Sequence, residues 1–127
     1  MTQAELNYCA GLQAGEAHDL LDALLHDLRD ELFEDEWIEL QQVQSEWERF
    51  MDSDCDWEAS LFEGGSILPM VHSLCRRNAY YDRIDRLRFL LCERGMAGPC
   101  PASAAYAVTE PVLQATGAAT SPPPPTP

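Results

Sequence analysis

Five cysteines and three histidines are the side chains of the 127-residue chain with the clearest potential for chemistry. Thiols form disulfides or, together with imidazoles, bind zinc. No two cysteines have the C-x-x-C spacing of a structural zinc site, and the histidines lack the spacing of a helical zinc site. We therefore expect disulfides and no metal or other cofactor, with one thiol left over because the number is odd. The residues concerned are Cys9, Cys55, Cys75, Cys92, Cys100, His18, His26 and His72.

The sequence patterns that usually mark a catalytic site are absent. There is no Gly-x-Ser-x-Gly nucleophile turn, no phosphate-binding P-loop and no Gly-x-Gly-x-x-Gly fingerprint. Carboxylates are abundant, but a run such as that in residues 31–39 is typical of a solvated helix face. We therefore expect a binding protein rather than an enzyme.

The chain is strongly acidic, and the acid is concentrated in its first half. It holds 22 Asp and Glu against eight basic residues, all of them Arg, for a net charge of −14. Phosphate backbones and anionic lipid surfaces repel such a chain, and no run is apolar enough for membrane insertion, so nucleic-acid and membrane binding are not expected. Residues 1–63 carry −16, whereas residues 64–94 carry +3. Part of the charge should pair internally, and the rest favours a basic partner.

Glycine and proline divide the sequence into three amphipathic segments and a tail. Apolar residues recur three or four positions apart within each segment, as in a helix with one buried face. The pattern predicts an all-α fold, an antiparallel three-helix bundle or array of helical hairpins, with a disordered Pro-rich C-terminal tail. The helices are expected over residues 2–32, 35–61 and 66–94, in one domain over residues 1–94, with an Ala/Pro/Thr-rich tail over residues 95–127.

The second segment carries all three tryptophans on one stripe. Because a buried tryptophan removes roughly 150–250 Å² of surface from water, we expect this stripe to be core rather than an exposed aromatic binding face. The stripe, interrupted only by Asp54, is Trp37, Leu40, Val43, Trp47, Phe50, Trp57 and Leu61.

An up-down-up bundle fixes which residues of the second and third helices face each other. If the chain reverses at its paired glycines, facing residue numbers sum to about 130, as those of Cys55 and Cys75 do. These two cysteines can form a disulfide worth about 3 kcal/mol. Cys92 and Cys100 flank a short segment and can form a second one. Cys9 has no obvious partner and could compete for either Cys55 or Cys75.

The same register places Arg83 close to Trp47, where a guanidinium can stack on an indole ring. Asp52 lies on the facing helix as well. We expect Trp47, Asp52 and Arg83 to form a partly buried network of charged and aromatic groups that is structural rather than a ligand contact.

The second and third segments also carry a string of motifs that resembles the LprI-like lysozyme inhibitors. The string is Gln44-x-x-Trp47-x-x-Phe50-x-Asp52-x-x-Cys55-x-x-Glu58, then Gly64-Gly65-Ser66-x-x-Pro69-Met70, Cys75, Arg83 and Leu87. The opening Thr2-Gln3-x-Glu5-x-Asn7-x-Cys9-Ala10 is similar to the start of that family, and the resemblance covers about residues 2–91. It implies an exported or lipid-anchored helical domain of the cell envelope, with Cys55 paired to Cys75 and lysozyme inhibition in at least one member. A further cysteine often precedes the Thr-Gln motif in this family and could pair with Cys9.

Three positions depart from the family pattern. Met51 stands where the family has Arg, Tyr80 where it has Thr, and His18-x-x-Leu21-Asp22 where it has Asp-x-x-Leu-Asn. If these positions contact a target, the departures put inhibition in doubt, whereas if they serve packing, only local stability changes.

The sequence therefore predicts a periplasmic or secreted protein whose acidic surface binds a basic protein such as lysozyme. A non-catalytic interaction or scaffold module of an envelope complex is the alternative, and a cytoplasmic location is the alternative if Met1 is the natural start. The target and the oligomeric state are left open. The predicted contacts lie at the corner between the first and second helices and are Glu31, Glu34, Asp35, Glu36 and Glu39.

Overall fold

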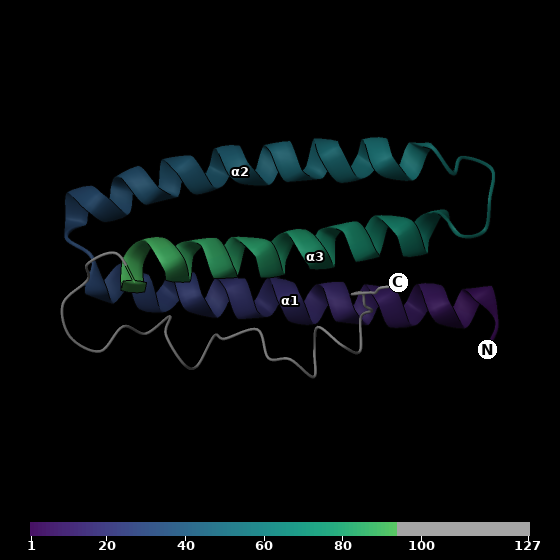
Figure 1. The fold of residues 1–127 in the computed structure, drawn as a ribbon, viewed down its shortest axis with the longest axis horizontal. Coiled ribbons are helices and arrows are strands. Elements are labelled where there is room, and N and C mark those ends of the chain that lie inside the picture. Colours follow the sequence, from purple (N-terminus) through teal and green to yellow (C-terminus); the bar gives the residue numbers. More distant parts are fainter. Residues whose placement is uncertain (94–127) are drawn as a thin grey trace, which may run out of the picture.

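The structure is a computed structural model that describes residues 1–93 of the chain. The predicted tail and the predicted Cys92–Cys100 bond lie outside the described residues and side chains. Residues 1–93 fold into three long helices and a short π-helix and contain no strand, so the predicted all-α, antiparallel three-helix architecture is confirmed (Figure 1). The elements are α1 (Gln3–Glu31), α2 (Glu34–Ser60), α3 (Leu68–Arg88) and η1 (Phe89–Glu93).

Helix α3 lies between the other two helices, as the ribbon in Figure 1 shows. It packs most extensively along α1 and less along α2, whereas α1 and α2 barely touch. Helix α2 therefore has essentially one neighbour, and a narrow buried stripe is enough to hold it.

Local signals set the helix ends. The Thr2 hydroxyl accepts the Glu5 N–H at 3.1 Å and the Glu5 carboxylate accepts the Thr2 N–H at 2.7 Å, which forms the capping box expected from the sequence. These hydrogen bonds lower the pKa of Glu5. Between α2 and α3 the chain turns at Gly64, whose φ of +85° is left-handed and favours glycine. The Asn7 side-chain amide donates to the carbonyl of Ser66 at 3.0 Å and ties this connection to α1.

The core lies where α1 and α3 face each other, and α2 closes one side. Small residues in the first half of α1 let α3 approach closely, and leucines take over in the second half. The buried core cluster is Ala17, Leu21, Leu24, Leu28, Met51, Cys55, Tyr80, Ile84 and Leu87.

The prediction that the tryptophan stripe of α2 forms core is wrong over half its length. Trp37, Leu40 and Trp47 are half-buried, but Val43, Phe50, Trp57 and Leu61 are exposed. The stripe averages fewer than 3.6 residues per repeat, so it winds around the helix and leaves the side that packs on α3. The α2 residues that are buried are instead Gln44, Met51, Cys55 and Ala59.

Candidate functional site

A disulfide between Cys55 and Cys75 joins the C-terminal part of α2 to the first half of α3. Their Cα atoms lie 5.6 Å apart, and the bond closes a loop of 20 residues, which confirms the predicted pairing. Cys55 is fully buried, so the bond also fixes which side of α2 faces α3. Among the cysteines with described side chains, Cys9 is free and half-buried.

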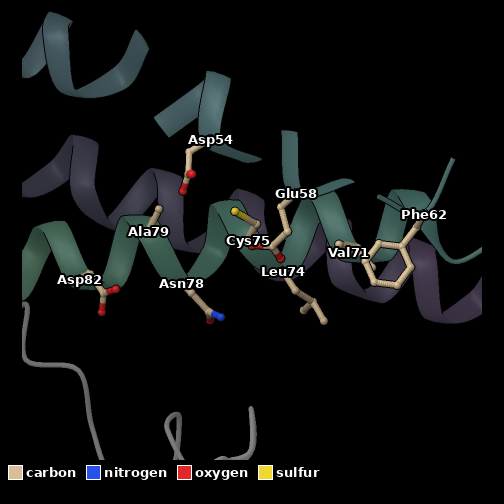
Figure 2. Close-up of a pocket in the computed structure, with 9 residues that line it drawn as sticks. All are labelled: Asp54, Glu58, Phe62, Val71, Leu74, Cys75, Asn78, Ala79 and Asp82. Carbon is tan, nitrogen blue, oxygen red and sulfur yellow. The ribbon is translucent and has the colours of Figure 1, made fainter. Parts of the chain in front are cut away.

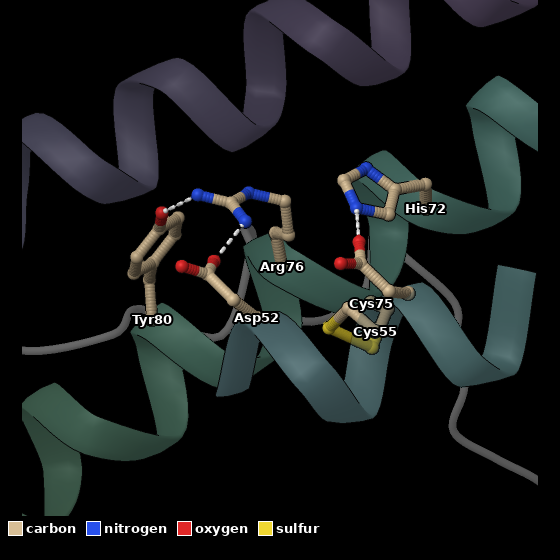
Figure 3. The surroundings of a disulfide bond; sticks show 7 residues. Asp52, Cys55, His72, Cys75, Arg76 and Tyr80 are labelled. Carbon is tan, nitrogen blue, oxygen red and sulfur yellow. Dashed lines mark hydrogen bonds and ion pairs between the residues drawn. A yellow bond between two sulfur atoms is a disulfide. The ribbon is translucent and has the colours of Figure 1, made fainter. Parts of the chain in front are cut away.

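Two polar side-chain contacts flank this disulfide on the α2–α3 interface (Figure 3). The Arg76 guanidinium donates one hydrogen bond to the Asp52 carboxylate and another, of 2.7 Å, to the Tyr80 hydroxyl. One turn further along, His72 Nε2 lies 2.9 Å from a carboxylate oxygen of Asp56. Burial alone would lower the pKa of the Arg76 guanidinium, but the Asp52 hydrogen bond and the neighbouring Tyr80 together raise it. Arg76 is therefore a stable cation that links α2 to α3.

The predicted network of Trp47, Asp52 and Arg83 is divided in two. The Arg83 guanidinium lies 5.6 Å from the centre of the Trp47 ring, and its Nε donates to the Gln44 side-chain oxygen at 2.9 Å. Asp52 binds Arg76 instead, because Arg76 lies about two turns of α3 nearer to it. Burial lowers the pKa of Arg83. The Gln44 Nε2 group is buried and has no hydrogen-bond partner within the described residues.

Of the positions that depart from the family pattern, Met51 and Tyr80 lie inside the protein, whereas 43% of the His18 side chain and 64% of the Asp22 side chain are exposed. Tyr80 is 3% exposed, and Met51 belongs to the same core cluster. The His18 ring packs edge-on against Tyr80 with ring centres 5.4 Å apart, and Trp47 lies on Tyr80 as well. Met51 and Tyr80 therefore act on packing, and the His18 ring packs on Tyr80.

The acidic corner consists of Glu31, Glu34, Asp35, Glu36 and Glu39 around the connection from α1 to α2, and all five side chains are exposed. Within residues 1–93 no ion pair neutralises any of them. Glu36 accepts the Phe33 N–H at 2.9 Å and Asp35 accepts the Glu36 N–H, so these two carboxylates also hold the start of α2. The side chain of Phe33 is 76% exposed in the middle of this negative charge. The corner thus presents carboxylates around one apolar ring.

A second feature is a groove along the seam between α2 and α3. Figure 2 shows one part of it, a cavity of about 380 Å³ with Asp54, Glu58 and Phe62 on one side and Val71, Leu74 and Asp82 on the other. A further cavity of about 480 Å³ lies along the same two helices near the acidic corner, where Leu32, Glu36 and Glu39 contribute to its wall. Glu36 and Glu39 therefore belong to both the corner and the groove.

Sequence reasoning did not pair Asp52 with Arg76 or Asp56 with His72, although a usable signal was present. The residue numbers of Asp52 and Arg76, and those of Asp56 and His72, both sum to 128, close to the value that brings the two cysteines together. Opposite charges at facing positions could therefore have been paired by the same register.

Neither a cluster of metal-binding side chains nor a membrane-spanning helix is found in the described part of the chain. Within residues 1–93, no group of three or more His, Cys, Asp or Glu side chains could hold a metal ion. None of the helices in this part is both long and apolar enough to cross a bilayer.

Comparison with known proteins yields one match. The family model described as "Lysozyme inhibitor LprI" matches residues 1–87, which includes the corner, the disulfide and nearly all of α3. No curated protein and no solved structure matches the chain.

Proposed function

Because the chain belongs to the lysozyme inhibitor LprI family, we propose that it is a non-catalytic protein of the cell envelope that binds and inhibits a lysozyme. The observation that carries the proposal is the family match over residues 1–87, and the acidic corner supplies a surface suited to the partner. Lysozymes are commonly cationic, and complementary charge steers two proteins together and fixes their orientation.

The geometry of the corner supports its role as the contact. Two long helices meet there through a connection of two residues, Leu32 and Phe33, so the corner protrudes from the end of the molecule (Figure 1). The exposed Phe33 ring can enter an apolar part of an enzyme cleft while the surrounding carboxylates pair with basic residues at its rim. We propose that this wedge blocks access of the glycan substrate.

The three departures from the family pattern do not argue against this activity. Met51 and Tyr80 are buried, so neither can touch a partner without unfolding of the core. His18 packs on Tyr80, far along α1 from the corner. Met51 and Tyr80 act on packing, and the partly exposed His18 and exposed Asp22 lie along α1 away from the corner, so the proposed contact surface is left unchanged.

The disulfide supports a location outside the reducing cytosol. Structural disulfides persist in the periplasm and in secreted proteins and are rare where thiols are kept reduced. We propose a periplasmic or secreted location, in which Cys55 and Cys75 stay oxidised and a lysozyme is encountered.

A turbidity assay of lysozyme acting on bacterial cells tests the proposal. The corner variant replaces Glu31, Glu34, Glu36 and Glu39 with Gln and Asp35 with Asn, which keeps the oxygen acceptors that hold the start of α2. The matched control changes five other exposed acids to amides and alters the net charge equally. The control residues are Glu16, Asp19, Asp22, Glu48 and Glu63.

We expect the native protein to inhibit at micromolar concentration and the corner variant to need at least about tenfold more protein, a loss of about 1.4 kcal/mol. The control variant should stay within about threefold of the native protein. The difference in inhibitory concentration between the native protein and the corner variant should become smaller as added salt screens the charges. Absence of inhibition by the native protein would refute lysozyme inhibition, whereas equal losses in both variants would refute only the corner as its site.

The alternative function is a non-inhibitory interaction module of an envelope complex. The observation that favours it is the exposed apolar face of α2, which the acidic corner does not use. Binding to a lysozyme without any effect on its activity, or capture of a different envelope protein by purified native protein, would favour this alternative.

A further inference from the structure

Four large apolar side chains form a stripe along one exposed face of α2. Val43, Phe50 and Trp57 follow one another at intervals of seven residues, and Leu61 continues the line one turn later. The stripe is open to solvent, with 69% of Phe50 and 64% of Trp57 exposed. A contiguous row of exposed aromatic and aliphatic side chains on a soluble domain is typical of a contact surface.

Exposed carboxylates border this stripe on both sides. Helical spacing places Glu39 and Glu46 along one edge and Asp54 and Glu58 along the other. All four are exposed, and no ion pair within the described residues neutralises them. The only basic residue of α2, Arg49, lies on a different face of the helix.

The groove in Figure 2 runs beside the stripe and adds depth to it. Asp54 and Glu58 belong to both features, Val71 and Leu74 add apolar wall on the α3 side, and Phe62 adds apolar wall from the connection that follows α2. Near Val43 the neighbouring cavity also contains Arg83 and Arg86, so the negative border is strongest from Phe50 to Leu61. The surface thus combines an apolar strip, acidic edges and a shallow groove.

We propose that this face of α2 is a docking surface for a cationic amphipathic helix of a partner protein. Such a helix places apolar residues three and four positions apart against the stripe and groove, and its Lys and Arg residues pair with the acidic edges. The proposal goes beyond lysozyme inhibition, and the surface shares only Glu39 with the acidic corner.

Charge favours a basic helix over two other possible occupants of this surface, a second copy of the chain and the chain's own segment beyond residue 93. A second copy of the chain would bring two acidic borders together, and each copy carries −14 overall. The chain beyond residue 93 contains one Arg and one Glu, so it offers no row of cations to match the borders. A basic helix is the occupant for which both the apolar and the charged parts of the surface find partners.

Binding of designed peptides to the full chain tests the proposal. The probe is a peptide of about 18 residues, five helical turns, with Leu at helical spacing on one face and Lys elsewhere. One comparison peptide replaces every Lys with Glu, and a second keeps the composition but scrambles the Leu positions. Affinity is measured by calorimetry for the native chain, for Phe50→Ser/Trp57→Ser and for a control, Leu12→Ser/Ile38→Ser, which removes two other exposed apolar side chains.

We expect the Leu/Lys peptide to bind the native chain and the control alike, and to bind the stripe variant at least about tenfold more weakly. The Glu peptide and the scrambled peptide should each bind at least about tenfold more weakly to the native chain. Circular dichroism checks that both variants keep the native helix content. The proposal is overturned if the native chain does not bind the Leu/Lys peptide, if either comparison peptide binds as tightly, or if both variants lose affinity equally. Sedimentation showing a native dimer that Phe50→Ser/Trp57→Ser dissociates would assign the surface to a second copy and would also overturn it.

Discussion

Loss of the Cys55–Cys75 disulfide should remove a large part of the stability of this domain. The perturbation is the double substitution Cys55→Ala/Cys75→Ala, which prevents the bond while leaving small apolar side chains at both sites. The bond joins residues 20 apart in sequence, and the chain-entropy relation for a loop of that length gives about 3 kcal/mol. The arrangement of the helices makes the loss specific, because α2 depends almost entirely on its contact with α3.

Urea unfolding, monitored by circular dichroism, measures the loss of unfolding free energy. For a domain of this size, about 3 kcal/mol corresponds to a decrease of about 10–20 °C in melting temperature. The control is Cys9→Ser, which removes the free thiol and should leave the unfolding free energy nearly unchanged in the absence of reductant. Adding dithiothreitol should reproduce the loss in the native chain, and any additional effect on the double variant would belong to other cysteines.

The reasoning would be refuted by a double variant that loses less than about 1 kcal/mol. That result would mean that the packing of Met51 and Ala59 on α3 holds α2 without the crosslink. A loss near 3 kcal/mol that also appears in Cys9→Ser would equally contradict it, because the effect would then not belong to the bond.

Three further substitutions have effects that follow from the structure and can be measured by thermal unfolding. Leu28→Ala removes a fully buried side chain and should cost about 2–5 kcal/mol. Tyr80→Phe removes the hydroxyl that accepts a 2.7 Å hydrogen bond from Arg76 and should cost about 1 kcal/mol. Burial, and to a smaller extent the charge of Asp85, raises the pKa of the Asp82 carboxyl. The ionised carboxylate therefore opposes folding. This destabilisation appears as the pH rises above the pKa of Asp82 in the unfolded chain and is complete above its pKa in the folded protein. Asp82→Asn should therefore stabilise the protein at pH 7 by up to about 0.5 kcal/mol, and the gain should vanish below about pH 3.

Each of these substitutions has a matched change at an exposed site. Leu12→Ala, Tyr8→Phe and Glu46→Gln remove the same kinds of group from side chains that face solvent. They should alter the unfolding free energy by less than about 0.5 kcal/mol. Equal effects at the two members of a pair would contradict the packing, hydrogen-bond or desolvation argument made for that pair.

The helices and their register were predictable because local signals determine them. The Thr2 capping box starts α1, and the turn at Gly64 sets the antiparallel register that brings Cys55 opposite Cys75. The same register brings Arg83 to within 5.6 Å of Trp47.

The buried face of α2 could not be predicted from hydrophobicity. A helix with one neighbour buries only a narrow stripe, and here that stripe contains Gln44 and Ala59, which no ranking by hydrophobicity selects. The large aromatic residues Phe50 and Trp57 remain in water instead. Which part of the tryptophan stripe is exposed, and where the groove beside it lies, depend on α3 being the central helix of the three. The position of α3 is a property of the tertiary arrangement and not of any local segment.

The central position of α3 also affects how the chain folds. The largest interface joins α1 to α3, which are not neighbours in sequence, as the 2.6 Å hydrogen bond between Arg77 and Gln13 across 64 residues illustrates. The whole of α2 must be looped out before that interface forms, which raises the contact order and slows folding relative to a bundle of sequential hairpins. A preformed crosslink shortens this loop by the 20 residues between the two cysteines. Because the entropic cost of closing a loop depends only logarithmically on its length, that cost falls by only about 0.3 kcal/mol. The disulfide therefore holds α2 in place after folding and does little to speed the meeting of α1 and α3.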